Sequence, residues 1–133
     1  MFFAGSDRTN APWVSHKDLV NMTVRLNGNA TFKCLQENIP AGIAGLQFDW
    51  IKWSKDNSMN SALDIDYGNF TIIDSNSKFI VKPSTEDHKH VSYLTIHNVT
   101  ADDKGLYSCV ACNQYGRDYS SAFLSLNTTP GPG

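Results

Sequence analysis

The sequence predicts an all-β chain folded as a two-sheet β-sandwich, and three observations predict it. Short segments with apolar residues at every second position recur along the 133-residue chain. Turn-forming residues separate them at regular spacing, and no segment has the period of a convincing helix. Cys34 and Cys109 lie in two of these segments, far apart in the sequence, so one disulfide could join the two sheets.

The first strand candidates lie in the N-terminal third of the chain. One shows the alternation of a half-buried strand, with four apolar residues at every second position: Val20, Met22, Val24 and Leu26. Asn27-Gly28 then predicts a tight turn. The following segment places three residues on one face: Ala30, Phe32 and Cys34. We therefore expect two adjacent strands here, the second carrying the first cysteine into the core.

The middle of the chain alternates between loops and strands. Loops are expected where polar or Pro- and Gly-rich residues gather, at 37–45, 54–68 and 83–90, with a short edge strand near Leu63–Ile65 inside the second. Strands are expected where β-branched and aromatic residues gather, at 46–53, 69–73, 78–81 and 91–97.

The C-terminal part predicts a hairpin. Residues 98–104 form a turn with one helical coil, and a strand follows at 105–112. The tip is Asn113-Gln114-Tyr115-Gly116, and the last strand, 117–126, turns three residues inward: Ala122, Leu124 and Leu126. The total is eight or nine short strands.

Three features combine around the predicted disulfide. Trp50 follows Cys34 on another strand, in register with Phe48, and its indole can pack against the bridge. The run Asp103 to Cys109 has the pattern D-x-G-x-Y-x-C. Tyr107 shares the inward face of Cys109, so its hydroxyl can bond the backbone of the preceding turn. Cys34, Trp50, Tyr107 and Cys109 are therefore the expected core.

Residues 20–126 resemble an immunoglobulin domain of the I-set type, so the resemblance implies an immunoglobulin-like (I-set) sandwich. Four segments are most similar to ectodomain modules of FGF-receptor and VEGF-receptor tyrosine kinases: 48–52, 94–99, 105–113 and 121–124. The segment between Trp50 and Ile73 resembles the membrane-proximal ligand-binding domain of the FGF receptors. We expect the domain to span 12–127, with a flexible or cloning-derived lead-in at 1–11 and a linker or tail at 128–133.

Composition and motifs exclude several functions. The net charge of −2, with scattered basic residues, gives no argument for nucleic acid, and it does not indicate heparan sulfate, although a patch could assemble in three dimensions. Nucleophile-elbow, phosphate-loop and zincin motifs are absent, so we expect no enzyme, cofactor or metal in this domain. His88 and His90 have metal-compatible spacing but lack a third ligand nearby.

The sequence predicts an extracellular location in a secreted or single-pass membrane protein. N-x-S/T sequons, the acceptors of N-linked glycans, occur at five positions: Asn21, Asn29, Asn69, Asn98 and Asn127. Chance is the alternative, because Asn, Ser and Thr are abundant, but five sequons favour the secretory pathway.

Four residues are candidates for ligand contact. Trp53 lies three positions after Trp50 and faces the other side of its strand, so its indole is either an exposed contact or a cover for the sheet edge beneath the long loop. The hairpin tip supplies the other three: Asn113, Gln114 and Tyr115. The FGF-receptor resemblance implies ligand contact at this tip; the alternative is an ordinary turn.

Cys112 is the odd cysteine. It lies three residues after Cys109 and so faces away from the core, which favours a free thiol or an intermolecular bridge.

Together these features predict a receptor-type module that binds a protein ligand, with an FGF-class growth factor implied by the resemblance alone. A kinase elsewhere in the full protein would respond. The alternatives are an adhesion or axon-guidance module that binds another immunoglobulin protein, and a structural spacer in a tandem array. The charged insertion at 82–90 lengthens the span between the cysteines beyond that of the usual receptor module.

Overall fold

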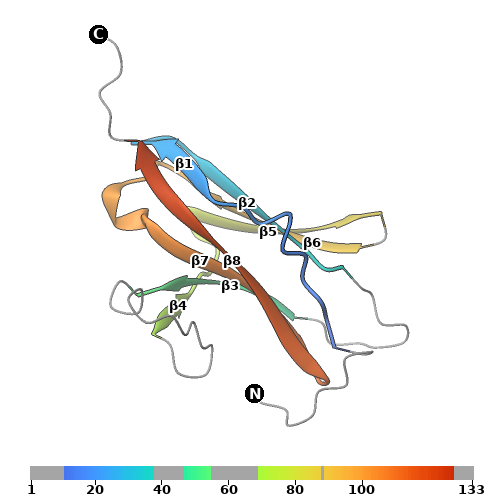
Figure 1. Cartoon of the computed structure of the whole chain (residues 1–133). Helices are drawn as coiled ribbons and strands as arrows, with labels where there is room; N and C mark the ends of the chain where they lie inside the picture. The colour runs from blue at the N-terminus through green and yellow to red at the C-terminus, as the bar shows by residue number, and fades with distance from the viewer. Residues whose placement is uncertain (1–10, 38–46, 55–68, 88, 128–133) are drawn as a thin grey trace.

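The computed structural model describes residues 11–37, 47–54, 69–87 and 89–127, and these residues form a two-sheet β-sandwich (Figure 1). The fold class expected from the sequence is therefore confirmed. The predicted loop at 54–68, with its edge strand near Leu63–Ile65, lies almost wholly outside the described residues, as does most of the loop at 37–45.

The larger sheet has five strands in the order β1-β8-β7-β3-β4. Their bounds are Met22–Arg25 for β1, Gly116–Asn127 for β8, Gly105–Asn113 for β7, Gln47–Trp53 for β3 and Phe70–Ile72 for β4. The first pair, β1 and β8, is parallel, and the other pairs are antiparallel.

The smaller sheet is antiparallel, in the order β2-β6-β5. Its bounds are Ala30–Leu35 for β2, Lys89–Ile96 for β6 and Phe79–Glu86 for β5. An isolated antiparallel bridge between Val14 and Gln36 continues the pairing beyond the end of β2.

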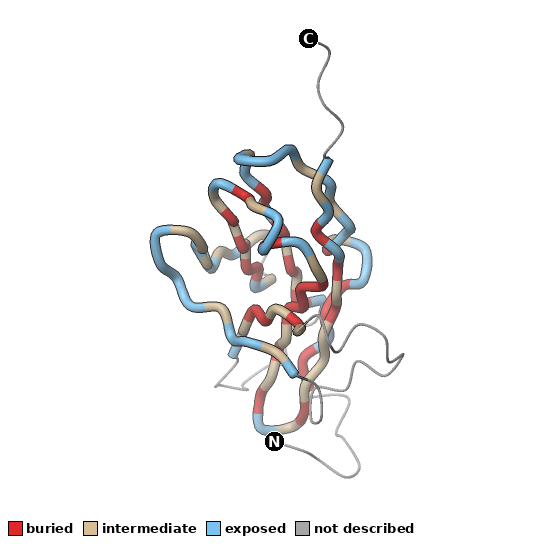
Figure 2. The backbone as a smooth tube through the Cα atoms, turned by 90° about the vertical axis from the view of Figure 1, so that its left-hand side faces the viewer, coloured by how far each residue is buried: buried red, intermediate tan, exposed pale blue. Residues whose placement is uncertain are grey.

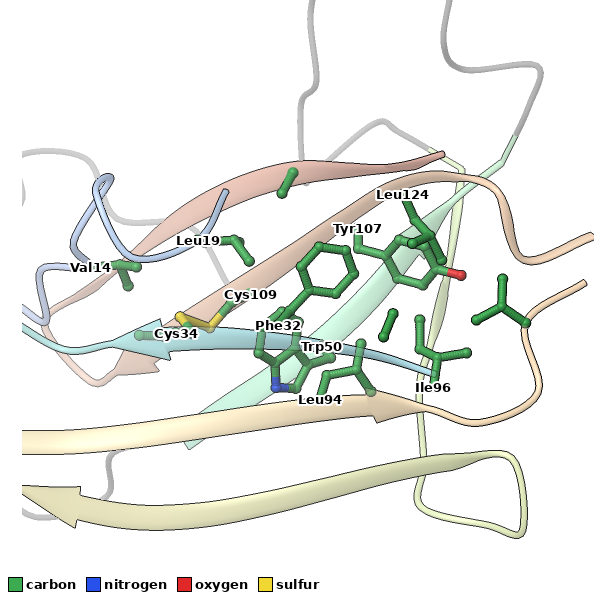
Figure 3. Close-up of a cluster of buried hydrophobic side chains, with 14 residues drawn as sticks. Val14, Leu19, Phe32, Cys34, Trp50, Leu94, Ile96, Tyr107, Cys109 and Leu124 are labelled. Carbon is green, nitrogen blue, oxygen red and sulfur yellow. A yellow bond between two sulfur atoms is a disulfide. The ribbon is translucent and has the colours of Figure 1, made fainter. Parts of the chain in front are cut away.

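The core lies between the sheets, where buried residues from both layers face each other (Figures 2 and 3). The disulfide between Cys34 and Cys109 crosses the sandwich. Phe32 packs beside two aromatic rings, with centroids 6.4 Å from Trp50 and 5.6 Å from Tyr107. One face of β2 and one face of β7 thus meet around the disulfide.

Two buried polar groups of this core have partners. The indole Nε1 of Trp50 donates to Ser92 Oγ at 2.9 Å, and the hydroxyl of Tyr107 donates to the carbonyl oxygen of Asp103 at 2.5 Å. Burial, with the nearby Asp103 charge, raises the pKa of Tyr107 far above its usual range, so the phenol stays a donor. An unpaired donor in a core is costly, and both of these large side chains are buried with their donors paired.

The prediction of a loop at residues 83–90 is wrong. Residues 83–90 mostly continue the strands β5 and β6, which pair as far as Glu86 and Lys89. Polar residues suit these strands because the outer face of the smaller sheet meets solvent. There Lys33 Nζ donates to Glu86 Oε1 at 2.9 Å, and the hydroxyl of Tyr93 donates to the same carboxylate. The charged insertion is therefore a longer hairpin.

The turn before β7 is organised by Asp103, which ends the short 3-10 helix η2 (Ala101–Asp103). Its carboxylate accepts the Thr100 N–H at 2.7 Å and lies 2.8 Å from Lys78 Nζ. Gly105 follows with φ of 139°, which side-chain-bearing residues rarely adopt. The turn before β7 is thus held by the contacts of the Asp103 carboxylate and ends at Gly105.

The ion pair of Asp103 predicts a pH-dependent stability. Burial alone would raise the pKa of Asp103, but the bonds from Lys78 and Thr100 outweigh it and hold the pKa below the ordinary 3.8. A folded-state pKa below the unfolded one contributes stability above pH 3.8, and this contribution is lost as the pH falls through the folded-state pKa.

We therefore expect Asp103→Asn to be less stable than the parent chain at neutral pH by about 1–2 kcal/mol, and the difference to shrink in acid. Urea denaturation at neutral and at strongly acidic pH measures it. The exposed neighbour, changed as Asp102→Asn, is the control. A difference that stays constant with pH would contradict the ionic origin.

Candidate functional site

The hairpin tip between β7 and β8 is a turn whose shape depends on Asn113. This residue is only 6% exposed, and its Oδ1 accepts the Tyr115 N–H at 2.9 Å. Such a bond is a local side-chain cap of a turn. Gln114 is exposed and Tyr115 is half-buried, so these two side chains are the ones the tip presents to a partner.

Trp53 is not an exposed contact residue, which corrects the first of the two expectations for it. Its indole is 4% exposed, its Nε1 donates to Ser108 Oγ at 2.7 Å, and Phe70 packs edge-on with a centroid distance of 5.5 Å. Trp53 lies on the outer face of β3, opposite Trp50, within a small cluster that includes Ile51 and Leu106. Its partner is therefore the adjacent strand β4.

The tip and the long-loop anchors lie at opposite ends of the sandwich. Ser54 and Asn69 flank the loop, and the Ser54 N–H donates to the Asn69 carbonyl at 2.8 Å. Lys52, two residues before Ser54, pairs with Tyr107 near the start of β7. The two anchors therefore lie at the start of β7. The tip closes the other end of β7, about 20 Å further along the strand. The anchors of the long loop are thus far from the tip, and residues 55–68 of the loop itself lie outside the described residues (Figure 1).

A groove lies close to the tip, and sequence reasoning missed it. Residues 13–17, Glu37 and Asp118 line a volume of about 440 Å³. The Glu37 N–H donates to the Trp13 carbonyl at 2.7 Å, and the Val14 N–H donates to Asp118 Oδ2 at 2.9 Å. Trp13 itself is 46% exposed. A large aromatic in a polar N-terminal stretch was the only signal in the sequence for this groove.

Cys112 forms no disulfide and is half-buried on the outer face of the larger sheet. Its neighbours across the sheet are Gln47 and Arg117. The Sγ lies 3.7 Å from the carbonyl oxygen of Asn113. The thiol is thus beside the hairpin tip and outside the core.

All five sequon asparagines are exposed: Asn21, Asn29, Asn69, Asn98 and Asn127. Two of these side chains accept a backbone hydrogen bond through the carbonyl oxygen: Asn21 Oδ1 accepts the Phe123 N–H at 2.9 Å, and Asn29 Oδ1 accepts the Asn98 N–H at 3.0 Å. Glycosylation modifies the amide nitrogen, so these bonds are compatible with an attached glycan.

Among the described residues, no group of three or more His, Cys, Asp or Glu side chains could hold a metal ion. His88 lies outside them, so its pairing with His90 is not described. In the same part of the chain, no helix is long and apolar enough to span a bilayer.

Comparison with known proteins gives a consistent fold and several kinds of relative. The model of the immunoglobulin I-set domain matches residues 14–126. The myoblast growth factor receptor egl-15 of Caenorhabditis elegans is 32% identical over 82% of this chain and 10% of that protein. Fibroblast growth factor receptor-like 1 of Mus musculus is 28% identical over 85% of this chain and 20% of that protein.

Muscle and interaction proteins also match. The muscle M-line assembly protein unc-89 of Caenorhabditis elegans is 30% identical over 87% of this chain and 1% of that protein. Among solved structures, an I-band fragment of titin has a TM-score of 0.59 at 26% identity, covering 87% of this chain and 32% of that one. The Dpr2 complex with DIP-Theta has a TM-score of 0.63 at 23% identity, over 88% and 32%.

This chain spans a fifth or less of the length of these curated relatives. A domain of this kind has no catalytic role of its own. Its relatives include a growth factor receptor, a growth factor receptor-like protein and a muscle assembly protein.

Proposed function

We propose that this chain, which belongs to the immunoglobulin I-set family, is an extracellular module of a cell-surface receptor that binds a protein ligand through the β7–β8 hairpin tip. The observation that carries the proposal is the tip itself, where Asn113 caps the turn through the Tyr115 N–H, Gln114 is exposed and Tyr115 is half-buried. Loops held by a rigid sandwich are common binding surfaces.

The ligand we propose is a growth factor of the fibroblast growth factor class. Two relatives support it: the mouse protein is named fibroblast growth factor receptor-like 1, and the nematode protein is named a myoblast growth factor receptor. Both match over more than four-fifths of this chain. The identities of 32% and 28% support a related module rather than the same ligand.

The extracellular location is part of the proposal. Five exposed sequons and an inter-sheet disulfide support it, because N-glycans and stable disulfides both belong to the secretory pathway. The contrary consideration is unc-89, a muscle M-line protein by name, which is 30% identical.

A second candidate is a module that binds another immunoglobulin domain or spaces its neighbours in an array. It is favoured by two exposed apolar side chains on the outer face of the larger sheet, Ile72 and Phe123. Sheet faces that bind other proteins carry such residues. In that case substitutions on the face, and not at the tip, would weaken binding.

Binding of the secreted chain to a panel of fibroblast growth factors tests the proposal. The double substitution Gln114→Ala/Tyr115→Ala is expected to weaken binding at least tenfold, which corresponds to about 1.4 kcal/mol. The matched control is Asp102→Ala/Lys104→Ala, two exposed residues at the other end of β7, and it should bind like the parent. A folded chain that binds no factor of the panel would sink the ligand class.

A further inference from the structure

The five sequons share one end of the sandwich. Asn127 ends β8, beyond the pairing of Leu124 with Gly105 at the start of β7. Asn29 and Asn98 flank the turns at the same end, and bond each other. We refer to this as the sequon end; the opposite end, with residues 113–116, is the tip end (Figure 1).

The remaining two sequons lie in the same half. Asn21 bonds the backbone of Phe123, which pairs with Leu106, the second residue of β7. Asn69 precedes Phe70, the partner of Trp53, close to the same residues. Glycans at the five sequons would crowd the sequon end and the neighbouring parts of β4 and β8. The tip end carries no sequon among the described residues, so a partner can reach it.

The groove opens at this tip end. Asp118 pairs with Ala111, two positions before Asn113, and Glu37 follows the end of β2. Its walls are fixed by backbone bonds: Ser15 N–H donates to the Leu35 carbonyl at 2.9 Å, and the Val14–Gln36 bridge lies directly beneath. A groove with fixed walls loses little entropy when a ligand side chain enters.

The lining has the composition of a site for a cation. It offers one exposed indole, Trp13, and two carboxylates, Glu37 and Asp118, against one ammonium, Lys17. Together Glu37, Asp118 and Lys17 leave one net negative charge. A guanidinium stacks flat on an indole and bonds a carboxylate through two parallel N–H groups, whereas an ammonium bonds a carboxylate as a point charge and cannot stack.

We propose that the groove of residues 13–17, Glu37 and Asp118 is the docking site for an arginine side chain of the protein ligand, at the end of the domain that sequons leave bare. The inference rests on the proposed protein-binding function but not on the identity of the ligand. Trp13 stacks on the guanidinium plane, and Glu37, the exposed carboxylate, accepts its hydrogen bonds. Asp118 holds the wall through Val14 and contributes charge.

Titration of the isotope-labelled chain with N-acetyl-arginine amide tests the site without any growth factor. Saturable shifts are expected at the Trp13 indole N–H and the Val14 amide, with a Kd of about 1–10 mM. N-acetyl-citrulline amide has the same shape without the charge and should bind at least fivefold more weakly. Shifts spread over the surface, or equal binding of citrulline, would overturn the proposal.

Two substitutions separate the contributions. Glu37→Gln and Trp13→Leu are each expected to weaken arginine binding at least threefold, while Asp102→Asn, at the sequon end, leaves it unchanged. Both positions are exposed, so the variants are expected to fold, and the spectra check this. Unchanged affinity in Glu37→Gln would exclude a role for the carboxylate and overturn the site.

The glycans provide an independent check in the secreted chain. Enzymatic removal of the natural glycans is expected to change arginine binding less than twofold, because they lie at the other end. The double substitution His16→Asn/Asp18→Thr places a sequon on the groove and should abolish the shift once glycosylated. A secreted chain that binds arginine but no growth factor would refute the ligand class and keep the groove; the reverse result would refute the groove alone.

Discussion

Replacement of Cys34 and Cys109 with alanine is expected to lower the free energy of unfolding by about 4.5 kcal/mol or more. The bridge closes a loop of 75 residues, and on the chain-entropy model a loop of that length contributes about 4.5 kcal/mol. Both sulfurs are fully buried, so the alanine variant also loses packing against Phe32 and Trp50. The loss is a large share of the stability of a domain of this size.

Urea denaturation of the parent and of the Cys34→Ala/Cys109→Ala chain measures this loss. Cys112→Ser is the matched control, because that thiol forms no disulfide and lies on the outer face; we expect it to change the stability by about 0.5 kcal/mol or less. A double-alanine chain with the stability of the parent would show that the two sheets hold together without the bridge.

Trp50→Ala is expected to destabilise the chain by about 3–5 kcal/mol. The indole is 1% exposed and lies in the core cluster that contains Phe32 and both cysteines of the disulfide. Its removal leaves a cavity that strands from two sheets cannot close, and Ser92 loses its hydrogen-bond donor. Most of the loss is expected from the cavity.

The free energy of unfolding of two further variants separates the cost of the cavity from the cost of the lost hydrogen bond. Trp50→Phe keeps most of the volume and loses the Ser92 bond, so we expect a smaller loss of about 1–2 kcal/mol. Trp13→Ala removes an equally large side chain that is half exposed, and should cost about 1 kcal/mol or less. Equal losses at Trp13 and Trp50 would contradict the assignment of the core.

The core could be predicted from the sequence because its main residues lie in short, recognisable motifs. A two-sheet sandwich can accommodate the two cysteines and Trp50 in only a few positions. Tyr107 is close in sequence to the turn that it stabilises, because its hydroxyl donates to the Asp103 carbonyl four residues earlier. Alternation also identified the inward residues of the last strand, where Ala122 and Leu124 are buried.

Features that depend on distant strands could not be predicted. The strands through 83–90 look like a loop because their outward residues are polar, and only the pairing with β6 identifies them. Trp53 has the spacing of an exposed residue, but β4 brings Phe70 against it. The groove joins Trp13 to Asp118 across the whole chain, a contact with no local signature.

The edge strand β5 restricts how copies of the domain can associate. A strand edge is a template for another chain. Part of the β5 edge is already covered, because Ser75 Oγ accepts the Val81 N–H at 2.9 Å and Asn76 Oδ1 accepts the Phe79 N–H at 2.8 Å. Pro83 lies inside β5, where it has no N–H to offer, and Lys82 beside it adds a charge. Addition of a strand from a second copy along this edge is therefore disfavoured. In a crowded tandem array or at a membrane surface, where local concentrations are high, this keeps neighbouring domains from merging into one continuous sheet.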